Sequence, residues 1–178
     1  ELLPRESLRH NLKKVKTFEP EEAIRLLDGV LSALIAAHRR GIIHRDVKPS
    51  NILLEQGVER TLLTDFGLAR ASDDASLTQS GYHPGTPQYM SPEQARGEAV
   101  DARSDLFSLG CVMYAMCTGR SPFRATTIAA AIRRVCDDTP RPIEEINPEV
   151  PDWMIGIIEN LLDKNADARF QSAAEVEE

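Results

Sequence analysis

Three short motifs supply the residue types from which an active site is built. The first runs from His44 to Asn51 (HRDVKPSN), the second is Asp65-Phe66-Gly67, and the third is Ser91-Pro92-Glu93. Each motif alone is weak evidence, because short strings recur by chance. Their occurrence in this order, with the first motif on a loop between short extended pieces, is a specific signal.

The side chains of the first two motifs suit phosphoryl transfer. Asp46 is a carboxylate that can orient a hydroxyl group and accept its proton. Lys48 follows two residues later, on the same side of an extended stretch, where its ammonium group can hold a phosphate oxygen. Asn51 and Asp65 offer oxygen ligands of the kind that Mg²⁺ prefers. An oriented acceptor, a divalent metal and nearby positive charge are what phosphoryl transfer requires.

Helices and short strands must position these groups. Pro20, followed by Glu21 and Glu22, predicts a helix that begins there and ends at Gly41. Ile24, Leu27, Leu31, Leu34 and His38 recur within it at helical spacing, which predicts a face packed on the core. Beyond Gly41 the pattern predicts short extended pieces over 42–43, 51–54 and 61–64. Residues 65–93 show little periodicity, which is typical of a functional loop.

The rest of the chain is predicted to be helical. Apolar periodicity and terminating residues predict helices over about 7–14, 102–117, 126–137, 151–163 and from 171 onward. The fold class that follows is mainly α, with a few short strands beside the motifs.

Length and charge limit the classes of function. The chain has 178 residues, which corresponds to about one domain, and a net charge of −7. Such a charge argues against a nucleic-acid binder whose affinity rests on neutralising phosphates, although a local basic cluster could still bind a small phosphate ligand.

The cysteines indicate the cellular compartment. Cys111, Cys117 and Cys136 lack the spacing of metal ligands and lie in helical, apolar sequence. We expect buried free thiols, hence a reducing, cytoplasmic environment, with any membrane segment lying outside this chain.

The motifs resemble those of the eukaryotic-like Ser/Thr protein kinases, and Ser91 to Gly97 (SPEQARG) is especially similar to the bacterial members. Segments 85–90 and 104–110 share the resemblance, which covers nearly the whole chain. It implies the large, C-terminal helical lobe of the protein-kinase α+β fold over 1–178. In it, residues 1–6 are the remnant of a hinge, 44–51 the catalytic loop and 65–93 the activation segment.

The resemblance also implies ATP and Mg²⁺ as cofactors and protein Ser or Thr hydroxyl groups as acceptors. Lys48 and Thr86 are the residue types of the Ser/Thr-directed branch. Leu53 matches the floor beneath the adenine, and Glu1 and Leu3 match the hinge. Ser7 falls where the family often contacts the ribose.

Structural roles follow from the same resemblance. His44 is expected to pack and to bond the backbone rather than to act as an acid or base. Asp105 is either a helix cap or, as in the family, a buried acceptor for the catalytic-loop backbone. Glu93 and Arg169 are either unrelated surface charges or the family's buried ion pair. The proline that usually precedes this arginine is absent, since Asp167-Ala168 stands there.

The family pairs Arg45 with a phosphate on the activation segment. The candidates for phosphorylation are Ser76, Thr78 and Ser80; alternatively these residues simply solvate a loop. We predict that phosphorylation of Thr78 or Ser80 raises activity, with a second kinase molecule as the partner for autophosphorylation.

No Gly-rich phosphate loop can be placed in the sequence. We therefore expect a small lobe in cis before Glu1, and expect residues 1–178 alone to be inactive. The main alternative is a catalytically silent, pseudokinase-like interaction module. A small-molecule phosphotransferase is disfavoured by residues 85–93, which in protein kinases form the platform that docks the peptide.

Overall fold

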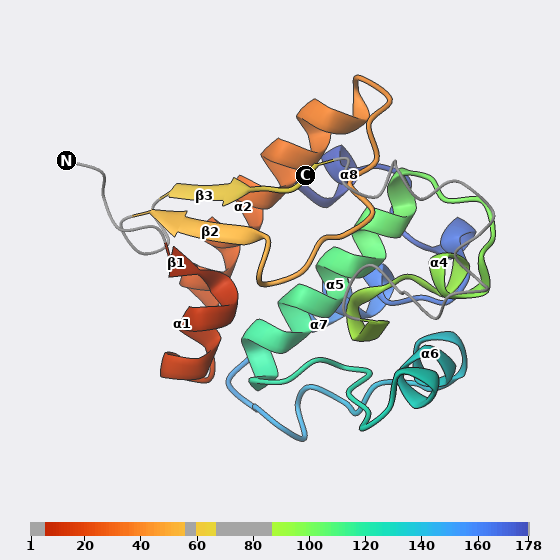
Figure 1. Ribbon diagram of the computed structural model, residues 1–178. Coiled ribbons are helices and arrows are strands. Elements are labelled where there is room, and N and C mark those ends of the chain that lie inside the picture. Colours follow the sequence, from red (N-terminus) through yellow and green to blue (C-terminus); the bar gives the residue numbers. More distant parts are fainter. Residues whose placement is uncertain (1–5, 56–59, 67–86, 178) are drawn as a thin grey trace.

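Helices dominate the described part of the molecule. The structure, a computed structural model, describes residues 6–55, 60–66 and 87–177. The elements in chain order are β1 (Glu6–Ser7), α1 (Leu8–Val15), α2 (Pro20–His38), β2 (Ile52–Glu55), β3 (Arg60–Leu63), η2 (Pro87–Tyr89), α4 (Pro92–Arg96), α5 (Ala102–Thr118), α6 (Ile128–Asp137), α7 (Asp152–Leu161), η3 (Ala166–Ala168) and α8 (Ala173–Glu177). Figure 1 shows the small sheet at one edge of a body of helices. The predicted mainly helical fold class with short strands is confirmed.

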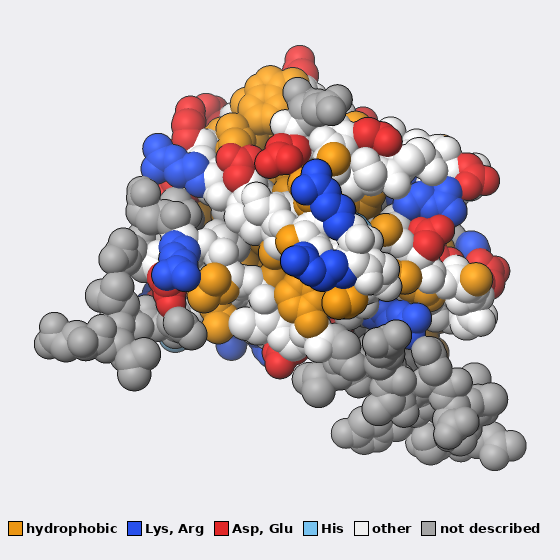
Figure 2. Space-filling view, turned by 90° about the horizontal axis from the view of Figure 1, so that it is seen from above, with side chains coloured by type: hydrophobic (Ala, Val, Ile, Leu, Met, Phe, Trp, Pro, Cys, Tyr) orange, Lys and Arg blue, Asp and Glu red, His pale blue; other side chains and the backbone are white. Residues whose placement is uncertain are grey.

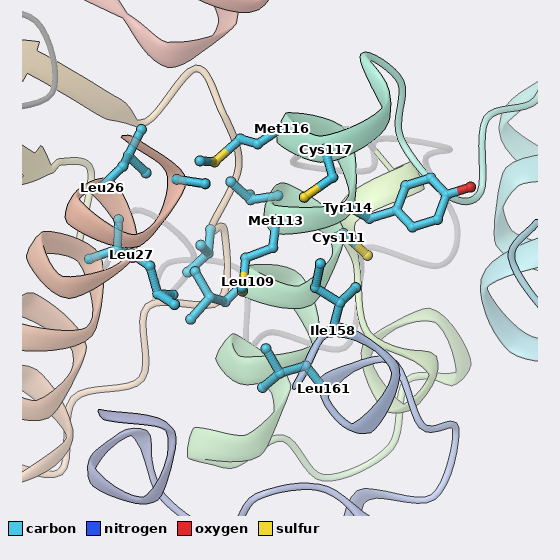
Figure 3. Packing of buried hydrophobic residues seen from close by; sticks show 14 of the residues in the cluster. Leu26, Leu27, Leu109, Cys111, Met113, Tyr114, Met116, Cys117, Ile158 and Leu161 are labelled. Atoms are coloured by element: carbon cyan, nitrogen blue, oxygen red, sulfur yellow. The ribbon is translucent and has the colours of Figure 1, made fainter. Parts of the chain in front are cut away.

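Helix α5 is the central element of the core. Every residue from Ser104 to Thr118 is buried, so this helix has no solvent-facing side. A helix that is apolar all round is typical of a core position. Figure 3 shows its side chains meeting those of α2 on one flank, around Leu26 and Leu27, and those of α7 on the other, at Ile158 and Leu161. The predicted helix over 102–117 is therefore confirmed.

Helix α2 begins where the sequence predicts. Pro20 stands in the first turn, and Glu19 and Glu22 form a reciprocal capping box. Leu27, Leu31 and Leu34 of the predicted stripe are buried, and Leu26 and Val30 widen the buried face. The helix ends at His38, and Gly41 follows with a positive φ of 69°. Glycine adopts that left-handed conformation without strain.

The sheet is antiparallel, with the strand order β1-β2-β3. Leu53 lies between Ser7 of β1 and Leu62 of β3 in the strand register. Its neighbours Ile52 and Leu54 are buried on the opposite face, whereas Leu53 is half-buried. The expectation of an extended piece at 42–43 is wrong, because the Ile42 amide bonds back to the Ala37 carbonyl in the turn that ends α2.

Helices α1, α6, α7 and α8 agree with the predicted ones to within a few residues, whereas the short helices η2, α4 and η3 were not predicted. Thr127 caps α6, its hydroxyl accepting a hydrogen bond from the Ala130 amide, and α7 follows Pro151. Cys111 and Cys117 are buried free thiols, as expected, and burial raises the pKa of both. Cys136 differs from the expectation and is half-buried, because it lies on the partly exposed side of α6. Among the described residues, no helix combines the length and the apolar character needed to cross a membrane.

Candidate active site

A buried carboxylate on α5 holds the loop that carries the first motif. Asp105 is fully buried, and its two oxygens accept hydrogen bonds from the backbone amides of His44 and Arg45, each at 2.8 Å. Its Oδ2 also lies 2.7 Å from His38 Nε2 of α2. Asp101, not Asp105, caps α5. Of the two roles considered for Asp105, helix cap or buried acceptor for the loop backbone, the structure shows the second.

The same loop is strained at Arg45, whose φ is 66°. A non-glycine residue in this region costs about 1–3 kcal/mol and persists where its surroundings fix it. Asp105 holds the Arg45 amide, and Gln94 Nε2 donates a 2.8 Å hydrogen bond to the Arg45 carbonyl. The backbone on both sides of the strained residue is thus held from two different helices, α5 and α4.

Gln94 was not among the site residues predicted from the sequence. Its Oε1 accepts from the Ser91 amide at 3.0 Å, while the Gln94 amide donates to Ser91 Oγ, which completes a capping box on α4. The S-x-x-Q spacing was the available signal. It marks a helix start, but it does not reveal the bond to Arg45, which lies 49 residues earlier in the chain.

Asp46 lies at the centre of a three-residue cluster. Lys48 Nζ is 2.6 Å from Asp46 Oδ2, and Asn51 Nδ2 donates to the same oxygen at 3.0 Å. Asn51 Nδ2 also donates to the Asp46 carbonyl at 2.9 Å. No hydrogen bond from a described residue reaches Asp46 Oδ1. One carboxylate oxygen is fixed in place, and the other can receive a proton.

His44 lies behind this cluster and is fully buried. The Asp46 amide donates to His44 Nδ1 at 3.2 Å, so the proton of the neutral ring is on Nε2, which lies 2.8 Å from the Thr64 carbonyl. The ring also meets Phe66 edge to face, with centroids 4.5 Å apart. With both nitrogens bonded to backbone groups, the His44 ring links the first motif to the residue that follows β3.

The two candidate metal ligands lie at one end of the sheet. Asn51 directly precedes β2 and Asp65 follows β3 by one residue, and the antiparallel register pairs Ile52 with Leu63. Thr64 links them, because its amide donates to the Asn51 carbonyl at 2.9 Å and its Oγ1 lies 3.3 Å from Asp65 Oδ2. Asp65 is exposed and has a φ of 65°. Thr64 was not singled out from the sequence.

These oxygen donors fit Mg²⁺. The Asn51 amide nitrogen is committed to Asp46, which leaves Oδ1 with one long bond from Ser50 Oγ, at 3.4 Å. The Asp65 carboxylate is turned to solvent. Mg²⁺ is usually held by one or two carboxylate or amide oxygens together with phosphate oxygens. Asn51 and Asp65 are therefore suitable protein ligands for such a site.

An ion pair connects the third motif to the C-terminal part of the chain. Arg169 donates from Nη1 and Nη2 to the two Glu93 oxygens, at 2.8 and 2.9 Å. Ser104 Oγ donates to Glu93 Oε1 at 2.6 Å, and Arg169 also donates to three backbone carbonyls. Burial alone would raise the pKa of Glu93, but the Arg169 and Ser104 hydrogen bonds outweigh it and lower that pKa to about 2.

The other predicted site residues form no hydrogen bond with the Asp46 cluster or lie outside the described residues. Ser7 caps α1, its hydroxyl accepting a hydrogen bond from the His10 amide at 3.3 Å, and it pairs with Leu53, so the two expected nucleotide contacts are neighbours. Several predicted residues lie outside the described part of the chain: Glu1, Leu3, Ser76, Thr78, Ser80 and Thr86.

Comparison with known proteins decides the family. The model of the protein kinase domain matches residues 1–178. The chain belongs to the protein kinase family. This kinase chain is 43% identical over 173 residues to the probable serine/threonine-protein kinase PknB of Bifidobacterium longum, covering 96% of the chain and 25% of that protein.

Further bacterial relatives agree. Identity is 40% over 172 residues with the probable serine/threonine-protein kinase SCO3848 of Streptomyces coelicolor, covering 96% of the chain and 25% of that protein. It is 44% over 160 residues with serine/threonine-protein kinase PknB of Mycolicibacterium smegmatis, covering 88% of the chain and 25% of that protein. The kinase chain spans about a quarter of the length of these relatives.

Proposed function

We propose that the protein is an ATP-dependent kinase that phosphorylates Ser and Thr hydroxyl groups of proteins. The observation that carries this proposal is the cluster around Asp46, in which Lys48 and Asn51 both bond Oδ2 and no described residue bonds Oδ1. The family membership and the names of the relatives support the same activity.

In the proposed reaction, Asp46 Oδ1 accepts a hydrogen bond from the substrate hydroxyl and orients its oxygen toward the γ-phosphorus of ATP. The new P–O bond forms as the bond from the γ-phosphorus to the β–γ bridging oxygen breaks, and ADP leaves. The hydroxyl proton passes to Asp46 and then to solvent. Lys48, 2.6 Å from Asp46 in the structure, stabilises the negative charge on the transferred group.

Asn51 and Asp65 are the proposed ligands for Mg²⁺, and the Thr64 hydrogen bonds keep the two residues in register. The metal supplies positive charge that neutralises the phosphate oxygens when it is bound. Leu53 would form the floor beneath the adenine, and Glu1, Leu3 and Ser7 would complete the hinge and ribose contacts. Residues 1–178 would then supply the larger lobe, with ATP between it and a smaller lobe in cis.

Regulation by phosphorylation is part of the proposal: in a cytoplasmic setting, a second kinase molecule would catalyse the transfer of the γ-phosphoryl group from ATP to the activation segment. A phosphate on Thr78 or Ser80 would carry close to two negative charges and form charge-assisted hydrogen bonds with Arg45. The Thr78→Ala, Ser80→Ala double variant of the full-length protein should therefore show a lower rate of substrate phosphorylation. An unchanged rate would contradict this part of the proposal.

The proposed activity is tested with full-length protein, Mg²⁺, ATP and a peptide that contains Ser, Thr and Tyr. Mass spectrometry of the product should locate phosphate on Ser or Thr, which agrees with Lys48 and Thr86 as the residue types of that branch. Phosphate found only on Tyr would contradict the acceptor class. Nucleotide binding without any transfer would instead favour the pseudokinase-like interaction module.

A further inference from the structure

A wide hollow lined by arginine side chains lies away from the Asp46 cluster. It has a volume of about 790 Å³ and lies between the turn at 120–126, α6 and residues 138–141. Asp138 is the one acidic residue in the lining. Five arginines also line it: Arg120, Arg124, Arg133, Arg134 and Arg141. All five arginines are exposed. We call this feature the arginine hollow.

The positive charge of the arginine hollow is only partly neutralised. Asp138 is shared by two arginines, at 3.2 Å from Arg133 and 3.7 Å from Arg134, and Arg141 pairs with Glu145. Among the described residues, Arg120 and Arg124 make no ion pair and no side-chain hydrogen bond. A net positive hollow is unusual in a chain whose charge is −7. On the face shown in Figure 2, by contrast, acidic and basic side chains are interspersed.

Contacts with the backbone fix the walls of the arginine hollow. Arg134 Nη1 donates to the Arg124 carbonyl at 2.7 Å, which ties α6 to the turn before it. Tyr114 of α5 donates from its hydroxyl to the Arg141 carbonyl at 2.9 Å, and its ring points away from α2 toward that side of the molecule in Figure 3. The arginines are thus presented by backbone that is anchored to the core.

A second cavity, mainly apolar, adjoins the arginine hollow. It has a volume of about 380 Å³ and shares three lining residues with the hollow, Tyr114, Thr139 and Arg141. Its other walls are formed by the apolar residues Pro140, Pro142, Ile143, Ile158 and Leu162 and by the charged residues Glu159, Asp163 and Lys164. Such a cavity has room for one large apolar side chain, whose burial would favour binding.

We infer that the arginine hollow and its adjoining cavity form a docking site for an acidic polypeptide segment that carries one large apolar residue. Charge complementarity accounts for the acidic character of the segment, and the cavity accounts for the apolar anchor. The phosphates of a nucleic acid could pair with the arginines, but a nucleic acid has no apolar side chain to fill the cavity. The inference goes beyond the proposed function, because binding here requires neither nucleotide nor phosphoryl transfer.

The docking site is tested with a fluorescein-labelled peptide made of Glu and Asp around a central Leu. Fluorescence anisotropy with the full-length protein should show binding that weakens as salt is added. The same peptide with Gln and Asn in place of the acids should not bind, and replacement of Leu by Ala should weaken binding roughly tenfold.

Arg120→Gln with Arg124→Gln removes the two arginines that make no ion pair with a described residue and should weaken binding about tenfold, because two exposed positive charges are lost. Both side chains are exposed, so the fold should be retained. Arg39→Gln with Arg40→Gln, at the far end of α2, is the matched control for the same loss of charge and should bind as the wild type does. Equal binding by the Arg120, Arg124 double variant and the wild type would overturn the inference. So would equal binding of the amide peptide, or tighter binding of single-stranded DNA than of the acidic peptide.

Discussion

Glu93 shows how one side chain couples the stability of the chain to pH. Its pKa is about 2 in the folded chain, against an ordinary value of 4.5. A carboxyl group whose pKa is lowered by folding stabilises the native state above its unfolded pKa. That stabilisation is lost as the pH falls from about 4.5 toward about 2, because protonation then breaks the pair with Arg169.

We predict that Glu93→Gln lowers the free energy of unfolding at neutral pH by about 3 kcal/mol, since it leaves the buried Arg169 guanidinium without its ionic partner. Urea unfolding at a series of pH values measures this. The wild type should lose stability below pH 4.5 and the variant should lose less, so the two curves should converge. Curves that stay parallel down to pH 2 would contradict the assigned role.

Gln94 contacts the loop that carries Asp46 through the Arg45 carbonyl. The contributions of its side-chain oxygen and nitrogen can be distinguished by substitution. Gln94→Glu keeps the Oε1 acceptor for the Ser91 amide but loses the donor to the Arg45 carbonyl. We predict that kcat of the full-length protein falls about tenfold, the equivalent of one lost hydrogen bond to a loop that must hold Asp46 in place. The unfolding midpoint should change little.

Gln94→Leu removes both bonds and is the comparison variant, which should lower both the rate and the unfolding midpoint. A purely structural role for Gln94 would give the opposite pattern for Gln94→Glu: an unchanged kcat with a lower midpoint. That pattern would contradict its role as a positioning residue.

At the scale of elements, α5 and α7 approach closely at a glycine. A Cβ added at Gly110 would lie 2.8 Å from Leu161 Cβ and 3.2 Å from two Leu162 side-chain atoms. Because the neighbours are buried in the core, they cannot move without disturbing their own packing. The crossing of these two helices therefore depends on the absence of a side chain at this position.

We predict that Gly110→Ala destabilises the chain by roughly 1–3 kcal/mol, measured by urea unfolding. Gly156→Ala is the control on the exposed side of α7, where an added Cβ has nothing within 4 Å. It should stabilise the chain by up to about 1 kcal/mol, because alanine favours the helix over glycine. Destabilisation of the same size by both variants would show that the α5–α7 approach is not the cause.

At the scale of the whole molecule, local patterns predict the elements well. Pro20 with Glu21 and Glu22, together with Gly41, predicts the bounds of α2, and the apolar run after Ala102 predicts α5. Within the first motif, Lys48 and Asn51 lie close enough in the chain to reach Asp46, and the structure brings the three together. These features are encoded by residues that are close together in the chain.

Long-range contacts could not be predicted in the same way. The bonds from Gln94 to Arg45 and from His38 to Asp105 join residues 49 and 67 positions apart. No spacing in the sequence indicates these bonds. The five arginines of the arginine hollow are spread from 120 to 141, and only the fold brings them around one space. Residues 42–43 are apolar like a strand, but the Ile42 amide bonds to the Ala37 carbonyl in the turn that ends α2.

The transfer of phosphate by the whole protein depends, in this account, on Asp46 as the proton acceptor. The most direct measurement compares single-turnover phosphorylation of a Ser/Thr peptide by full-length wild type and Asp46→Asn, with nucleotide affinity measured in parallel. Asp46→Asn should lower the rate by about 10²–10⁴-fold at unchanged nucleotide affinity, whereas the exposed α2 control Asp28→Asn should match the wild type. A rate for Asp46→Asn equal to that of the wild type would contradict the account.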